Sequence, residues 1–208
     1  MVKVKICGIT NWEDAVASVA CGCDALGFVF YKKSPRYISP KNAQKIIRLL
    51  PENILKAGVF VNAQEKTIKD IARKCKLNAL QFHGDESAQF CRKFKNYKII
   101  KAFRVKDKLD LENIKKYRVS AYLFDTFIKS KIGGTGKKFD WKLLKQLKNT
   151  KRPVFLSGGL NEKNVAEAIK YLRPSWVDVS SSLESWPGKK DPKKIQRFIN
   201  AVKKSVLS

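Results

Sequence analysis

Short apolar segments alternate with amphipathic helical patterns along the whole chain. The first segment, residues 2–7, alternates apolar and polar positions, which is the period of two expected of a β-strand with two unlike faces. Gly8 ends this segment, and a pattern with helical spacing begins near Asn11. Seven further segments repeat the arrangement at a spacing of about 25 residues, so strands and helices are expected to alternate throughout.

These segments and their flanking residues predict the individual elements. Strands are expected at 2–7, 24–30, 55–61, 79–83, 98–103, 121–125, 153–157 and 176–180. Helices are expected at about 12–20, 65–74, 110–117 and 192–204, and from about residues 40, 139 and 162 onward. Ser39 and Pro40 are typical of an N-cap and first helical position, and Asn161 is expected to cap the seventh helix.

Alternating strands and helices predict a parallel sheet, because each parallel pair needs a crossover connection. Eight such units in 208 residues fit a small (β/α)8 TIM barrel of the α/β class. A doubly wound open sheet is the alternative, although such sheets more often have about five or six strands. No linker or break in composition divides the chain, so residues 1–208 are expected to form a single domain.

The composition narrows the class of protein. Hydrophobic residues make up 44% of the chain, which argues against global disorder. There is no apolar run long enough to span a membrane and no apolar signal region at the amino terminus. Five cysteines without a C-x-x-C pair, together with the single His83, argue against a zinc site. We therefore expect a reduced, cytoplasmic protein that binds no metal.

The net charge of +26 indicates an anionic partner of some kind, which could be nucleic acid, a membrane surface or a small ligand. Arginine supplies only nine of the 44 basic residues, whereas nucleic-acid readers usually rely on arginine. Lysine is spread through all the expected helices after the first, which is typical of solvated helix faces. Such lysines also steer an anionic substrate. A polyanion-binding protein on a barrel scaffold is the alternative, and its binding would depend strongly on salt.

Polar residues stand at the carboxyl ends of several expected strands, which meet at one rim of a barrel. They are Cys7, Arg36, Gln81, His83, Asp125, Asp178 and Ser180. Gln81 shares a strand face with His83, and Asp178 shares one with Ser180. The structural alternatives are a buried hydrophobe for Cys7, and a helix cap or a lysine-paired loop acid for Asp125.

Lys5 lies two residues before Cys7 on the same strand face, roughly 6–7 Å away at ~3.3 Å per residue. An ammonium at that distance favours the thiolate form of a cysteine. We therefore hypothesise that Lys5 lowers the pKa of Cys7.

Glycine clusters indicate a phosphate site. Gly158 and Gly159 follow the seventh expected strand, and Ser180, Ser181 and Ser182 follow the eighth, where barrels hold phosphate on backbone N–H groups. The loop at 133–137 lacks both the Walker A and the dinucleotide-binding spacing. It is better suited to a lid over the rim, and its Gly134 and Gly136 are expected to contribute to phosphate binding.

Seven sequence blocks, spread in order along almost the whole chain, resemble the phosphoribosylanthranilate isomerase family of tryptophan biosynthesis. They are KICGIT at 5–10, SPRYI at 34–38, QFHGDE at 81–86, FDT at 124–126, GGTGKKFDW at 133–141, SGGL at 157–160 and DVSSSLE at 178–184. Two positions depart from the family pattern. Phe82 replaces the usual leucine and should face the helices, and Ser182 replaces a glycine, which leaves the geometry of the phosphate cradle open.

The resemblance implies an Amadori rearrangement of N-(5-phosphoribosyl)anthranilate without a cofactor. It implies Asp125 as the general acid and Cys7 as the general base, with Arg36 binding the anthranilate carboxylate. The substrate-binding set also includes Gln81, His83 and Asp178. The expected partner is a small anionic phosphoribosyl substrate, with neither nucleic acid nor membrane. We expect a monomer, with a homodimer as the alternative. A related rival is the histidine-pathway ProFAR isomerase, which relies on a carboxylate base where this chain has Cys7.

Overall fold

The eight expected strands form a closed barrel, which rules out the open sheet. The computed structural model describes residues 1–105, 109–126, 150 and 152–207. The barrel strands are β1 (Lys3–Cys7), β2 (Ala25–Val29), β3 (Leu55–Phe60), β4 (Ala79–Phe82), β5 (Lys98–Val105), β6 (Ala121–Thr126), β7 (Val154–Ser157) and β8 (Trp176–Val179). Each strand pairs in parallel with the next, and β8 pairs with β1 to close the barrel. The fold is therefore a (β/α)8 TIM barrel.

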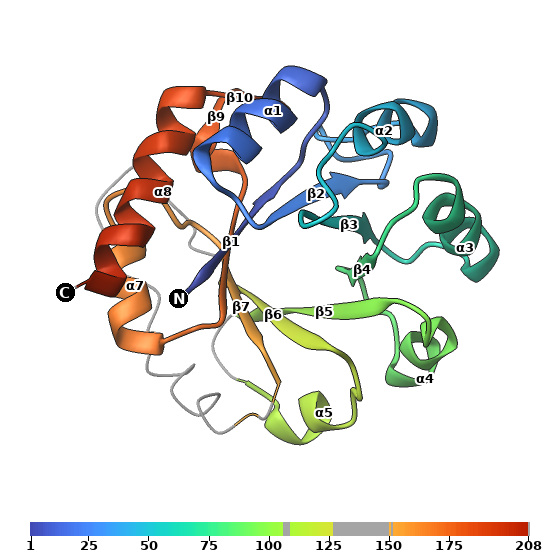
Figure 1. Ribbon diagram of the computed structural model, residues 1–208. Coiled ribbons are helices and arrows are strands. Elements are labelled where there is room, and N and C mark those ends of the chain that lie inside the picture. The colour runs from blue at the N-terminus through green and yellow to red at the C-terminus, as the bar shows by residue number, and fades with distance from the viewer. Residues whose placement is uncertain (106–108, 127–149, 151, 208) are drawn as a thin grey trace.

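The helices lie outside the ring of strands (Figure 1). They are α1 (Trp12–Cys21), α2 (Pro40–Ile47), α3 (Glu65–Lys74), α4 (Ala88–Cys91), α5 (Leu111–Lys115), α7 (Val165–Leu172) and α8 (Pro192–Leu207). The last helix, α8, packs against both α1 and α7, so the end of the chain covers the junction between the first and last strands. No helix among the described residues is long and apolar enough to cross a membrane.

The starts of α1 and α2 match the sequence prediction, whereas that of α7 does not. Asn11 accepts a hydrogen bond from the Asp14 N–H, and Ser39 accepts one from the Asn42 N–H ahead of Pro40. The seventh helix begins later than expected, with Asn164 and not Asn161 at the cap. Asn161 instead accepts the Lys163 N–H within a preceding turn, so the prediction was wrong by one turn. The helix expected from residue 139 lies outside the described residues.

The two faces of the strands bury different kinds of side chain. Outward-facing residues such as Ile6, Phe28 and Phe82 are fully buried between the strands and the helices. Phe82 packs against Phe90 and Phe94, with ring centroids 5.8 and 5.2 Å apart, which confirms that it faces the helices. The inner face begins with a small apolar cluster of Ala57, Ala79, Ile100, Ala102, Ala121, Leu123 and Phe155. The polar inward positions lie beyond this cluster, toward the carboxyl ends of the strands.

A short hairpin follows β8. Strand β9 (Glu184–Trp186) pairs antiparallel with β10 (Lys189–Lys190). Gly188 turns between them at φ +88°, and a Cβ there would lie 3.1 Å from the Pro35 carbonyl oxygen. The Thr10 hydroxyl donates to the Gly188 carbonyl at 2.5 Å. The hairpin is therefore fixed against the loops that follow β1 and β2.

A buried ion pair outside the barrel joins β5 to the loops after β3 and β4. Lys101 Nζ lies 3.0 Å from Glu86 Oε2, and each side chain is only 3% exposed. Lys101 also donates to the Gly84 carbonyl at 2.7 Å. Glu86 accepts the backbone N–H groups of Asn62 and Gly84, so its carboxylate holds the loops after β3 and β4 together.

Replacing Lys101 with methionine should destabilise the fold by ~3–5 kcal/mol, because it leaves the buried Glu86 carboxylate without its cation. Denaturant unfolding measures this loss. The matched control is Lys115→Met, which breaks an exposed ion pair with Glu112 and should leave the free energy of unfolding unchanged within error. Equal losses in the two variants would contradict the role given to Lys101.

Candidate functional site

A cavity of about 380 Å³ opens at the carboxyl ends of the strands. It is lined by every candidate residue that the structure describes: Cys7, Arg36, Gln81, His83, Asp125, Gly158, Gly159, Asp178, Ser180 and Ser181. Residues separated by more than a hundred positions therefore meet at one rim, as the barrel prediction required. Gly134 and Gly136 lie outside the described residues.

Cys7 ends β1 with its side chain inside the barrel, beside Gly27 of β2. A Cβ at Gly27 would lie 2.7 Å from Cys7 Sγ and 3.1 Å from Lys5 Nζ, so only glycine leaves room for both groups. Burial raises the pKa of the Cys7 thiol, and the Lys5 charge lowers it by less. The expected influence of Lys5 is therefore present, but burial outweighs it.

Lys5 and Asp178 form a completely buried ion pair inside the barrel. Lys5 Nζ lies 2.7 Å from Asp178 Oδ1, and the two side chains are 0% and 5% exposed. Ser157 Oγ donates to Asp178 Oδ2 at 3.2 Å, so both oxygens of this carboxylate have partners. Burial acts to lower the pKa of Lys5, but the charges of Asp178 and Cys7 outweigh it and raise that pKa. Lys5 is thus a cation beside the thiol.

Asp125 ends a chain of polar side chains that crosses from β4 to β6. Its Oδ2 lies 3.2 Å from His83 Nε2, and His83 Nδ1 lies 2.9 Å from Gln81 Nε2. Among the residues that the structure describes, the partner of Asp125 is therefore His83. Gln81 is 1% exposed, and its Oε1 has no hydrogen-bond partner among the described residues.

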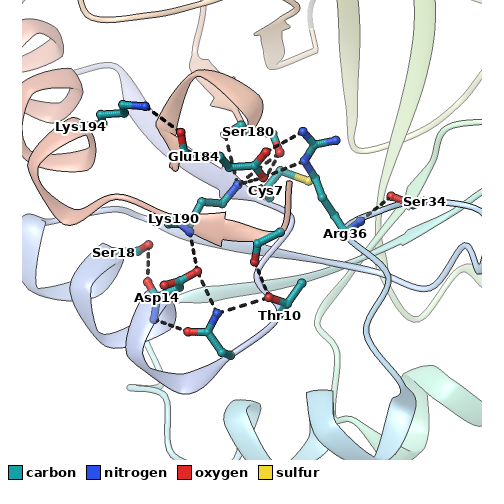
Figure 2. Close-up of polar contacts among 12 residues, drawn as sticks. Cys7, Thr10, Asp14, Ser18, Ser34, Arg36, Ser180, Glu184, Lys190 and Lys194 are labelled. Carbon is teal, nitrogen blue, oxygen red and sulfur yellow. Dashed lines mark hydrogen bonds and ion pairs between the residues drawn. The ribbon is translucent and has the colours of Figure 1, made fainter. Parts of the chain in front are cut away.

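Arg36 reaches the cavity from the loop after β2 and is held by Glu184 at the start of the hairpin. Nε and Nη2 of Arg36 donate to the two Glu184 oxygens at 2.7 and 2.6 Å. Lys190 Nζ lies 2.8 Å from the same carboxylate, and Figure 2 shows both cations converging on it. Burial acts to raise the pKa of Glu184, but its hydrogen bonds with Arg36 and Lys190 hold that pKa below its usual value.

Sequence reasoning gave Glu184 and Lys190 no role at the site. The signal that could have found them is their cross-strand pairing, because Lys190 stands opposite Glu184 across the Pro-Gly turn. Sequence reasoning also missed the apolar wall of the cavity, which is formed by Val29, Tyr31, Val59 and Val61.

The loops after β7 and β8 carry the glycine and serine clusters. Gly158 and Gly159 have φ values of +91° and +64°, which glycine adopts without strain. Ser180 Oγ donates to the Cys7 carbonyl at 2.9 Å, which ties this cluster to the end of β1. Ser182 is absent from the described positive-φ positions, so its backbone does not need glycine, and its hydroxyl donates to the Leu160 carbonyl. Within the described residues, no group of three His, Cys, Asp or Glu side chains is placed to hold a metal.

The sequence matches a known protein family along almost its whole length. Residues 4–201 match the family described as N-(5'phosphoribosyl)anthranilate (PRA) isomerase. A Trichlorobacter lovleyi protein named N-(5'-phosphoribosyl)anthranilate isomerase is 47% identical, covering 99% of this chain and 100% of its own length.

Two solved structures extend the likeness to the fold. The crystal structure of phosphoribosyl anthranilate isomerase from Thermotoga maritima has a TM-score of 0.91 and 48% identity, covering 98% of this chain and 100% of its own. A second structure of such an isomerase, in complex with reduced 1-(o-carboxyphenylamino)-1-deoxyribulose 5-phosphate, has a TM-score of 0.89 and 46% identity over 98% of this chain and 100% of its own. The chain therefore belongs to the N-(5'-phosphoribosyl)anthranilate isomerase family.

Proposed function

We propose that the cavity is the site where this chain converts N-(5-phosphoribosyl)anthranilate to 1-(2-carboxyphenylamino)-1-deoxyribulose 5-phosphate, a step of tryptophan biosynthesis. The observation that carries the proposal is that Cys7 of β1 and Asp125 of β6 line one cavity. Arg36 and the pair Gly158 and Gly159 line the same cavity. Membership of the isomerase family supports the same reaction. Residues 1–208 would then be a single catalytic domain.

Asp125 acts as the general acid on the furanose ring. It donates a proton to the ring oxygen, the bond from that oxygen to C1 breaks, and the nitrogen lone pair forms a C1=N iminium. Cys7, as the thiolate, then removes the C2 proton, and the freed electron pair forms C1=C2 while the nitrogen regains its lone pair. The resulting enolamine loses its C2 hydroxyl proton and gains a proton at C1, which gives the ketone. Each catalytic group contributes about 10²–10⁴-fold.

Gln81 and His83 bind the substrate in this proposal and also orient the Asp125 carboxyl group. His83 Nε2 lies 3.2 Å from Asp125 Oδ2, and His83 Nδ1 lies 2.9 Å from the Gln81 side-chain amide. Once the amide turns to present Oε1, the oxygen that otherwise has no partner among the described residues, it can accept an N–H on Nδ1. The contacts from Gln81 through His83 thus hold the Asp125 carboxyl group at the cavity.

The remaining side chains hold the two anionic ends of the substrate. Arg36 binds the anthranilate carboxylate, and the apolar wall beside it receives the aromatic ring. The phosphate rests on Gly158, Gly159, Ser180 and Ser181, with Gly134 and Gly136 expected to add to the same cradle. Asp178 completes the substrate-binding set.

The reaction needs neither nucleic acid nor a membrane, and it uses no cofactor. The +26 charge serves in this proposal to attract the anionic substrate. A cytoplasmic monomer is the expected form of the enzyme, with a homodimer as the alternative. Cys7 in place of a carboxylate at the end of β1 favours this reaction over that of ProFAR isomerase.

Cys7→Ser and Asp125→Asn should each lower kcat by about 10²–10⁴-fold, because each removes one proton-transfer group. The measurement is the loss of phosphoribosylanthranilate fluorescence, with thermal unfolding recorded alongside and expected to change little. Cys21→Ser, at a half-buried cysteine of α1, is the matched control and should keep full activity. Full activity in either of the first two variants would refute the assignment.

Arg36→Ala should raise KM by roughly 10- to 100-fold, since a hydrogen bond to a charged group contributes ~1.5–3 kcal/mol. The value of kcat should change much less, because Arg36 binds a group that does not react. Steady-state kinetics separate the two parameters. An unchanged KM would count against carboxylate binding by Arg36.

The double variant Lys5→Met with Asp178→Asn should raise the pKa of Cys7 further, because the Lys5 charge lowers that pKa by more than the Asp178 charge raises it, and no buried charge is left unpaired. The rate of alkylation of Cys7 against pH, followed by mass spectrometry of its peptide, measures this shift. Cys21 in the same protein is the internal control. A pH midpoint of alkylation that stays in place or moves down would show that the Lys5 charge does not lower the pKa of Cys7 as proposed.

A further inference from the structure

The Glu184 carboxylate is placed to orient Arg36 and not to bind a ligand itself. Both of its oxygens accept hydrogen bonds from Arg36, and its side chain is only 4% exposed. Arg36 is 23% exposed and lines the cavity, whereas Glu184 is absent from the lining. The guanidinium is therefore the part of this pair that meets the substrate.

The contact with Glu184 leaves one edge of the Arg36 guanidinium available. The group has five N–H donors, and Glu184 takes one on Nε and one on Nη2. The remaining donors lie on Nη1 and Nη2, which form the end edge of the fork. That edge matches a planar carboxylate with two parallel hydrogen bonds.

Gly8 sets the path of the Arg36 side chain. A Cβ at Gly8 would lie only 2.7 Å from Arg36 Cδ, so the arginine stem crosses directly over the Gly8 backbone. Gly8 has φ +81°, a conformation that favours glycine. The stem is thus confined on one side by Gly8, directly after β1, and held at its end by Glu184.

Lys190 has an ammonium group that offsets the negative charge of Glu184, which would otherwise neutralise the positive charge of Arg36. Its ammonium donates to Glu184 at 2.8 Å and to the carbonyl and hydroxyl oxygens of Ser180 at 3.2 and 3.3 Å. These contacts use all three of its N–H donors, and the side chain is completely buried. Lys190 therefore acts through Glu184 and Ser180, and the three charged groups keep a net charge of +1 beside the cavity.

We propose that Glu184 and Lys190 are positioning residues that fix Arg36 in the orientation needed to bind the aromatic carboxylate of the substrate. This inference rests on the proposed function and adds to it the residues that determine specificity for a carboxylated aromatic ring. Both positioning residues belong to the hairpin, with Glu184 in β9 and Lys190 in β10. Lys194 supports it by donating to the Glu184 carbonyl at 2.7 Å (Figure 2).

The test compares the binding of two ligands by isothermal titration calorimetry. One is reduced 1-(o-carboxyphenylamino)-1-deoxyribulose 5-phosphate, and the other is the same molecule without the ring carboxylate. Glu184→Gln should raise the Kd of the first ligand by roughly 10-fold, as expected for a misdirected charge-assisted contact, and that of the second by less than about twofold. In kinetics the same variant should raise KM and leave kcat nearly unchanged.

Two further variants separate positioning from a general loss of structure. Glu162→Gln breaks another glutamate–arginine pair, with Arg197 at 2.7 Å, and should leave both Kd values unchanged. In an Arg36→Ala background, Glu184→Gln should have no additional effect on the first ligand, because the residue it positions is already gone.

Three outcomes would overturn the inference. They are equal weakening of both ligands by Glu184→Gln, no weakening of either, or a full additional effect of this variant in the Arg36→Ala background. If the wild-type protein binds both ligands and isomerises phosphoribosylanthranilate, any of these results rejects the positioning role alone. A wild-type protein that binds neither ligand rejects the proposed function as well.

Discussion

The site depends on the ion pair between Lys5 and Asp178, which crosses the line where β8 closes onto β1. The two residues are 173 positions apart and stand opposite each other in the strand register. Both are buried inside the barrel, so the pair forms only when the last strand has reached the first. The same closure places the Ser180 hydroxyl on the Cys7 carbonyl and so brings the loop after β8 to the end of β1.

Cys7 lies between two buried lysine–carboxylate pairs, one inside the barrel and one in the hairpin. Lys5 with Asp178 and Lys190 with Glu184 both act on the thiol, and each lysine lowers its pKa against the larger effect of burial. Buried ion pairs of this kind contribute little net stability compared with apolar replacements. Their arrangement around one thiol and one arginine is better explained by the chemistry of the site. The fold holds charges in place, and the outward-facing apolar residues supply most of its stability.

Much of this arrangement could be predicted from the sequence because a strand has a period of two. That period placed Lys5 with Cys7 and Gln81 with His83, and it turned Phe82 toward the helices. Periodicity gives the direction of a side chain but not its depth. The sequence therefore predicted the influence of Lys5 on Cys7 but not that burial outweighs it. Nor could it show Glu184 at the site, because the contact with Arg36 requires the β9–β10 hairpin to fold against the loop after β2. The wrong cap at Asn161 has a simpler origin, since two asparagines three residues apart carry the same local signal.

We propose that one cavity brings a thiol, a carboxyl group and an arginine to a single phosphoribosyl substrate. The most direct test is a crystal structure of this protein with reduced 1-(o-carboxyphenylamino)-1-deoxyribulose 5-phosphate. We expect the sugar carbons to lie between Cys7 Sγ and the Asp125 carboxyl group, the ring carboxylate on Arg36, and the phosphate on the loops after β7 and β8. A ligand bound elsewhere, or one in this cavity that contacts neither Cys7 nor Asp125, would contradict the proposal.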